Sequence, residues 1–200
     1  MRKIGTPEEL EALYPEVVPA ARIKVAQRLT PLYRRWIAAA RFCVLSTVGP
    51  QGVHGSPRGD DGPVVRVADA GRLLMPDWRG NNRLDCLRDI VVDGRVALLF
   101  LVPGSNTTVR VNGRAVLTDD APLCQSFEQR GKHPTTVIVI TVTEVYTQCA
   151  KALMRSELWS RNDAEGLPTV GQILADMSNG EFGGADYDAT YAEHAKPRMW

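Results

Sequence analysis

The sequence predicts a mainly β domain with flanking helices (α+β), built as a closed or nearly closed antiparallel barrel. Three observations lead to this prediction: about seven short β-rich segments follow one another, tight-turn residues separate them, and one helical segment crosses in the middle. The 200 residues are 44% hydrophobic, enough to bury a core without metal or disulfide staples. We expect an N-terminal helical extension (1–40), the barrel (41–160) and a C-terminal extension (161–200) that packs on the barrel or on a dimer partner.

The N-terminal extension has helix-start signals. Thr6 is a hydroxyl N-cap, Pro7 suits the first helical position, and Glu9 is placed to complete a capping box. A second helix is expected over 20–29, and Pro31 opens a third. The first β-rich segments then form two successive hairpins, each closed by a glycine-containing turn. These strands are expected at 42–48, 53–58, 64–68 and 72–76.

The middle of the chain alternates between helical and β patterns. Leu84, Leu87 and Ile90 recur at three-residue spacing, which predicts an amphipathic helix over 81–90. The continuously apolar run at 96–102 predicts a strand that is buried on both faces. The remaining segments are strands at 107–117 and 136–146 and helices at 119–130 and 170–177.

Composition argues against several classes of partner. A net charge of +1 gives no global field that would attract nucleic acid or an anionic membrane, and 6% aromatic residues are few for a nucleic-acid-binding barrel. No apolar run approaches the roughly 20 residues that cross a bilayer. The four cysteines lack C-x-x-C spacing, so we expect reduced thiols and a cytoplasmic protein. The three histidines show no metal-ligand spacing, and hydrolase and dinucleotide motifs are missing.

One candidate site is the turn Arg79-Gly80-Asn81-Asn82-Arg83, between a strand end and an expected helix start. A helix N-terminus offers unpaired N–H groups and a partial positive charge, so the guanidinium and amide groups there predict an anion pocket, suited to a phosphate. The alternative is that Asn81 only caps the helix while the arginines face water. This segment alone does not decide between the two.

Two further clusters also lie at strand ends, where barrels bind ligands. In residues 55–60, proline and glycine interrupt sheet pairing. Ser56 and Arg58 are then free to form hydrogen bonds with the edge of a heterocycle. The alternative is that Arg58 pairs with Asp60. In residues 149–159, two cations and the Trp159 indole could close over a ligand. The alternative there is ordinary surface, with Leu153 and Trp159 docked in the core.

Over roughly residues 35–160 the chain resembles the pyridoxamine 5′-phosphate oxidase-like, FMN-binding split β-barrel proteins. The resemblance is carried by 42–47 with its Gly52 turn, by 55–60, by 80–83 with its following helix, and by 95–100, in this order and at these spacings. It implies an antiparallel split β-barrel of the FMN-binding type. It also implies a homodimer with two FMN molecules at the subunit interface, each held by both chains.

The resemblance also implies roles for particular residues. Ser56, Pro57 and Arg58 would contact the flavin ring, Met75 and Pro76 would lie along the ring and ribityl chain, and Asn82 and Arg83, beside Asn81, would hold the phosphate. Asn106, Thr107 and Thr108 match positions supplied by the second subunit, and Lys151, Arg155, Ser156 and Trp159 resemble a closing segment. The tail 193–200 departs from the arginine-and-histidine segment with which true oxidases bind the substrate phosphate, so vitamin B6 oxidation is disfavoured.

The leading functional hypothesis is an FMN-dependent oxidoreductase acting on a small or planar substrate. Reduction places negative charge on the N1–C2=O edge of the flavin, and Arg58 and Lys151 are candidates to stabilise it. The alternative is a non-catalytic flavin-binding or storage module. We expect a small-molecule ligand, a second copy of the chain as partner, and neither nucleic acid nor membrane.

Overall fold

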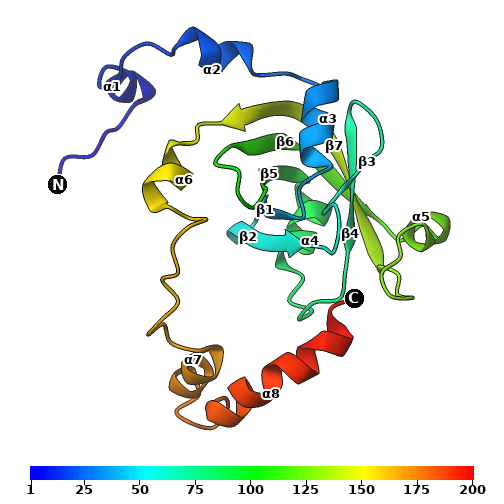
Figure 1. Ribbon diagram of the computed structural model, residues 1–200. Helices are drawn as coiled ribbons and strands as arrows, with labels where there is room; N and C mark the ends of the chain where they lie inside the picture. The colour runs from blue at the N-terminus through cyan, green and yellow to red at the C-terminus, as the bar shows by residue number, and fades with distance from the viewer.

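The computed structural model describes residues 1–200 and places seven strands in one antiparallel sheet, in the order β2-β1-β5-β6-β7-β4-β3 (Figure 1). This confirms the predicted mainly β class with flanking helices. The strands are β1 (Phe42–Gly49), β2 (Gly52–Gly59), β3 (Arg66–Val67), β4 (Arg72–Asp77), β5 (Arg95–Leu101), β6 (Thr108–Thr118) and β7 (Thr136–Gln148). The helices are α1 (Pro7–Glu11), α2 (Pro19–Ile23), α3 (Pro31–Ile37), α4 (Asp85–Val92), α5 (Ala121–Gln125), α6 (Lys151–Ser156), α7 (Val170–Met177) and α8 (Ala185–Ala195), followed by a 3-10 turn at Lys196–Arg198.

The curvature of the sheet brings its two ends together without closing the backbone ladder. β2 is the terminal strand on one side and pairs only with β1, whereas β4 lies near the other side, between β7 and β3. A side-chain contact bridges the opening, because Nη1 of Arg58 on β2 donates to Oδ1 of Asp77 on β4 at 2.5 Å. The barrel is therefore split between β2 and β4.

The core lies on the inner face of this sheet. Along β5, Val96, Leu98 and Phe100 are buried while the residues between them are half-buried. The expectation that β5 is buried on both faces is therefore wrong for the single chain, because its outer face is only partly covered. Buried residues of β1, β6 and β7 complete the core around Phe100.

The helix predicted over 170–177 is confirmed as α7, whereas two other helices and one strand are shorter than their sequence patterns predicted. The helix expected over 20–29 ends at Ile23, since Ala26 pairs with Val145 in an isolated β-bridge instead. The helix expected over 119–130 is confined to α5, and β3 keeps only two residues of the strand expected at 64–68. In each case packing against the barrel decides which residues keep regular structure.

The start of α4 was also predicted wrongly. The helix begins at Asp85 and not at Asn81, because Asn82 and Leu84 have left-handed backbone angles (φ 60° and 62°) that a right-handed helix cannot contain. The carboxamide Oδ1 of Asn81 accepts the backbone N–H of Arg83 at 3.1 Å, as in an Asx turn. The segment between β4 and α4 is therefore an irregular loop.

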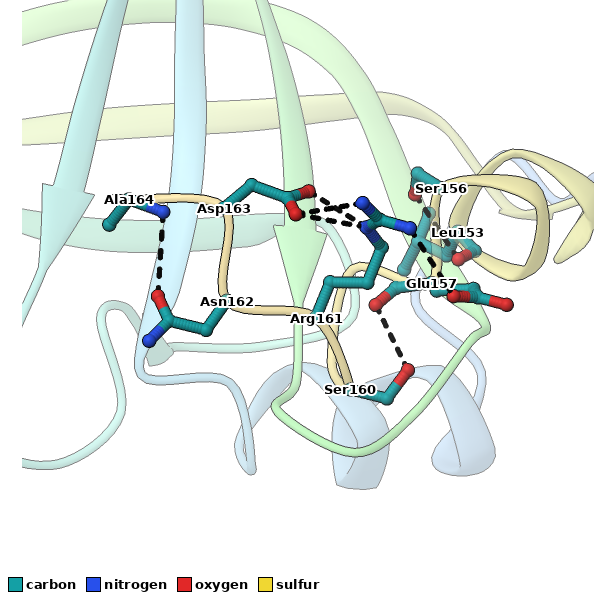
Figure 2. A network of polar contacts seen from close by, with 8 residues as sticks. All are labelled: Leu153, Ser156, Glu157, Ser160, Arg161, Asn162, Asp163 and Ala164. Atoms are coloured by element: carbon teal, nitrogen blue, oxygen red, sulfur yellow. Dashed lines mark hydrogen bonds and ion pairs between the residues drawn. The ribbon is translucent and has the colours of Figure 1, made fainter. Parts of the chain in front are cut away.

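Both terminal extensions lie around the barrel (Figure 1). The N-terminal extension contributes Leu29, Ile37 and Ala40 to the core, whereas the C-terminal extension contributes no residue to it. In α1, the Thr6 hydroxyl accepts the backbone N–H of Glu9 and caps the helix, as predicted. The predicted capping box is incomplete, because the Glu9 carboxylate accepts the N–H of Gly5 and not that of Thr6. After α6 the chain is held locally, with Arg161 bonded to Asp163 and 3.8 Å from Glu157 (Figure 2). The helix α8 carries no clear sequence signal and returns the chain end to the barrel. The helices are too short or too polar for any of them to span a bilayer.

Candidate ligand-binding cavity at the barrel split

A cavity of about 1280 Å³ lies at the split between β2 and β4. Its walls come from β2, the end of β4, the loop 78–84, the first turn of α4, residues 132–136 and the end of the chain. The predicted site residues that line it are Ser56, Pro57, Arg58, Met75, Pro76, Asn81, Asn82 and Arg83. Three segments that are separate in sequence thus form one cavity.

The β2 wall follows from strand alternation. His54, Ser56 and Arg58 are each half-buried and share one face, while the residues between them are exposed on the other. Their β1 partners are Thr47, Leu45 and Cys43, all on the inner face of the sheet. Pro57 is compatible with this position because β2 is a terminal strand, where a missing N–H interrupts no ladder on the open side.

Arg58 is fixed at the split by one ion pair and has an unused donor. Its guanidinium bonds Asp77, and both side chains are less than a fifth exposed. The predicted alternative, Arg58 paired with Asp60, is wrong, because Asp60 accepts the indole N–H groups of Trp78 (2.6 Å) and Trp200 (3.2 Å) instead. The Nε of Arg58 is buried and has no hydrogen-bond acceptor in the protein.

Cys43, which faces Arg58 across the β1–β2 pairing, is unsuited to chemistry. Burial raises the pKa of the Cys43 thiol to about 12, and the nearby positive charge of Arg58 only partly opposes this rise. The thiolate, the nucleophilic form, is therefore scarce at neutral pH.

In the loop between β4 and α4, the positive charge available to an anion comes from arginine side chains and not from the N-terminus of a helix. Nε of Arg83 donates to Asp85 Oδ2 at 2.9 Å, and three quarters of the Arg83 side chain is exposed. Asn81 caps the turn and not the helix. Residues 79–83, predicted to form an anion pocket at a helix N-terminus, do line the cavity. The helix N-terminus is not part of that segment, because α4 begins at Asp85.

The cavity lining has a small surplus of positive charge. Its four basic side chains are Arg58, Arg79, Arg83 and Lys132, and its acidic ones are Asp60, Asp77 and Asp85. Each of the three carboxylates already accepts a hydrogen bond from the protein. Arg79 and Lys132 form no ion pair within the protein, and one net positive charge of the lining is left for an anionic ligand.

A buried carboxylate that sequence reasoning missed supports one residue of the wall, His54. Asp89 on α4 is 5% exposed, and its Oδ2 lies 2.7 Å from both Thr47 Oγ1 and His54 Nδ1. These hydrogen bonds, Thr47 first and His54 second, hold the pKa of the Asp89 carboxyl below its ordinary range. Gly49 makes the approach possible, because a Cβ there would collide with the Asp89 carboxylate. Only the alternation of β2, which places His54 on the same face as Arg58, could have suggested this group from sequence.

The other predicted site residues lie elsewhere in the chain, outside the cavity. These are Asn106, Thr107, Thr108, Lys151, Arg155, Ser156 and Trp159. They form a second group, because Nε1 of Trp159 donates to Ser105 O at 2.8 Å and so ties the segment after α6 to the β5–β6 loop. Trp159 is 37% exposed, so the alternative that it docks in the core is wrong.

Comparison with known proteins places the chain in a family. Solved structures that resemble it include an FMN-binding protein from Syntrophomonas wolfei (12% identity, TM-score 0.44, covering 59% of this chain and 90% of that one). General Stress Protein 26 from Bacillus anthracis is another (20% identity, TM-score 0.43, covering 57% of this chain and 89% of that one). A third is HupZ from Group A Streptococcus (16% identity, TM-score 0.47, covering 59% of this chain and 92% of that one). No curated protein matches. The profile of the family described as pyridoxamine 5′-phosphate oxidase matches residues 29–149, more than half of the chain, and the protein therefore belongs to the pyridoxamine 5′-phosphate oxidase family.

Proposed function

We propose that the protein binds FMN in the cavity at the barrel split and acts as an FMN-dependent oxidoreductase on a small or planar substrate. One observation carries the proposal. In a chain of this family, the residues to which the resemblance assigns the flavin ring (56–58), the ribityl chain (75–76) and the phosphate (81–83) all line a single cavity.

The residues present fit this cofactor. At the ring side, the buried Nε of Arg58 has no hydrogen-bond acceptor in the protein. An unsatisfied buried donor costs about 1–3 kcal/mol. A carbonyl oxygen or a nitrogen of the flavin ring would accept this hydrogen bond and remove that cost. At the phosphate side, Arg83 and Arg79, which forms no ion pair within the protein, supply charge-assisted donors, and the Asn82 amide lines the same cavity. The cavity volume of about 1280 Å³ exceeds the roughly 300–1,000 Å³ typical of small-molecule sites.

When bound, FMN supplies the hydride or electron transfer, and the chain supplies position and electrostatics. Arg58 is held in place by Asp77, so little side-chain entropy is lost when it donates to a ligand. Met75 and Pro76 are buried and present an apolar surface at the β4 wall. Lys151, the other candidate for the N1–C2=O edge, lies outside the cavity of its own chain and could reach one only from a partner.

We propose that this partner is a second copy of the chain, with two FMN sites at the interface, each built by both chains. Support comes from α6 and the residues after it, where no side chain is buried and Met154, Leu158 and Trp159 are 59%, 49% and 37% exposed. An apolar surface of this kind, beside the second group of predicted site residues, is what a partner would cover. All four cysteines are free, which suits the reducing cytoplasm that we propose as its location.

The alternative, a non-catalytic flavin-binding or storage module, is favoured by one observation. Trp78 and Trp200 both bond Asp60 and line one end of the cavity, with Met199 beside them. These side chains occupy space that a substrate would need.

Visible absorption spectra of the purified protein test the proposal. After addition of FMN and removal of the excess, we expect one flavin per chain and bleaching on anaerobic addition of NADH or NADPH. Bleaching by dithionite alone would favour the binding module. Protein that takes up no FMN would refute both.

A further inference from the structure

His54, which lines the cavity, forms a carboxylate–imidazole pair with Asp89, which lies behind the cavity wall. The Asp89 side chain is 6% exposed and belongs to α4, whereas His54 belongs to β2 and is 30% exposed. Nδ1 of His54 lies 2.7 Å from Asp89 Oδ2, and the ring is among the residues that line the cavity. The pair thus connects a buried charge with the ligand space.

The donors around Asp89 determine which nitrogen of His54 carries the proton. An ionised carboxylate only accepts hydrogen bonds, and the Thr47 hydroxyl donates to the same oxygen at 2.7 Å. Nδ1 of His54 must therefore be the N–H donor. In the neutral ring, Nε2 then carries a lone pair, and it makes no hydrogen bond within the protein.

We propose that His54 is a proton acceptor toward the ligand in the cavity and that Asp89 is its positioning residue. The ligand it suits carries a polarised O–H or N–H group. In the transfer, that bond breaks and its electron pair stays on the ligand heteroatom. The proton moves to Nε2, and the Asp89 carboxylate balances the imidazolium charge that results. This inference rests on the proposed function only for the identity of the ligand.

The other polar and charged groups around the pair lie on α4, directly after it, and on β1, which packs against it. Asp93 acts on Asp89 as a like charge, but it is itself bonded to Arg95 at 2.7 Å. Asp85, in the first turn of α4, is bonded to Arg83. From β1, the neutral Thr47 hydroxyl donates to Asp89. Asp89 is therefore the one anion hydrogen-bonded to His54.

His133 provides an internal comparison. It lines the same cavity, and its Nδ1 lies 2.7 Å from the carbonyl oxygen of Phe127. This arrangement sets the same tautomer, but the acceptor is neutral. His133 therefore serves as a reference ring, whose behaviour a change at Asp89 should leave unaltered.

Nitrogen-15 NMR of full-length protein labelled in its histidines tests the tautomer. The chain has three histidines, so His54→Gln assigns the signal by its disappearance. We expect His54 in the Nδ1–H form at a pH where the ring is neutral. A dominant Nε2–H form would overturn the proposal, because Nε2 would then have no lone pair to offer.

Carbethoxylation by diethyl pyrocarbonate, followed by peptide mass spectrometry, tests whether Nε2 of His54 is accessible and whether its reactivity depends on Asp89. At a pH where the imidazole rings are neutral, we expect His54 to react, and we expect Asp89→Asn to slow that reaction by about tenfold with His133 unchanged. Equal rates at His54 in both proteins would overturn the role of Asp89. If Asp89→Asn fails to fold, the tautomer of His54 in the wild-type protein still decides, since a dominant Nε2–H form would contradict orientation of the ring by the carboxylate.

The same labelling with FMN separates this inference from the proposed function. We expect bound FMN to protect His54, and unchanged labelling in protein that has bound FMN would overturn the contact with the ligand. If the protein takes up no FMN, the proposed function fails. The tautomer and the Asp89→Asn comparison still decide whether the pair presents a base to the cavity.

Discussion

At the scale of single residues, the cavity presents polar side chains that the fold has already oriented. Arg58 is held by Asp77, and His54 is held by Asp89. Side chains fixed in this way lose little freedom when a ligand arrives, so more of their interaction energy appears as affinity. Arg83 differs, because it is largely exposed and shares its guanidinium with Asp85.

The phosphate assignment predicts a moderate loss of affinity. The double substitution Asn82→Ala and Arg83→Ala should weaken FMN binding by about tenfold, which corresponds to ~1.4 kcal/mol. This is the size expected for one charge-assisted contact whose guanidinium is already shared with Asp85. Flavin fluorescence titration measures it. Arg88→Ala, which removes an exposed arginine of α4 outside the cavity, is the matched control, and equal affinity in all three proteins would contradict the assignment.

The buried carboxyl of Asp89 predicts a pH-dependent contribution to stability. Its pKa in the folded protein lies below the ordinary value of 3.8, so the stabilisation is complete above that value and is lost as the pH falls through the folded pKa. The difference in unfolding free energy between wild type and Asp89→Asn should therefore shrink from about pH 4 downward. Urea unfolding at pH 5, 4 and 3 measures it, and a constant difference would count against an ionised Asp89.

At the scale of elements, strands were predicted more accurately than helices. Alternation and turn residues located β1, β2, β4, β6 and β7 to within a residue or two, because a half-buried strand shows its period in the sequence itself. The start of α4 depends on left-handed angles at Asn82 and Leu84, which no residue pattern specifies. The Asp89–His54 pair was missed for a related reason, since its members lie 35 positions apart and meet only when α4 packs on the first hairpin.

The close approach of α4 to that hairpin depends on Gly49. Gly49→Ala should destabilise the protein by about 1–3 kcal/mol, because the added methyl collides with the buried Asp89 side chain. Thermal or urea unfolding measures it. Gly55→Ala is the matched control in the same hairpin, where a Cβ meets nothing within 4 Å, and a cost as large as that of Gly49→Ala would refute the packing argument.

At the scale of the whole molecule, the predicted site residues fall into two groups that one chain does not bring together. One group lines the cavity, and the other lies on the β5–β6 loop and α6. The sequence could name both groups through the family resemblance. The resemblance also assigned Asn106, Thr107 and Thr108 to a second subunit. It left open where Lys151, Arg155, Ser156 and Trp159 lie, because their distance from the cavity is a property of the folded chain.

If the second group completes the site of a partner, disturbing its apolar surface should affect both assembly and binding. Leu158→Glu should shift the protein from dimer to monomer and reduce FMN affinity, since a carboxylate would be buried in the interface. Sedimentation velocity and flavin titration measure the two effects. Leu13→Glu places the same charge at an exposed leucine near α1 as a control. A monomeric wild type that binds FMN fully would contradict the shared site.

The terminal position of β2 also bears on how the folded chain avoids aggregation. An unpaired strand edge is a template on which another molecule can add a strand. Here the strand that lines the cavity carries Pro57, which lacks an N–H, between Gly55 and Gly59, and its Arg58 is tied across the split. The residues that shape the ligand wall therefore also discourage strand addition at the exposed edge of the sheet.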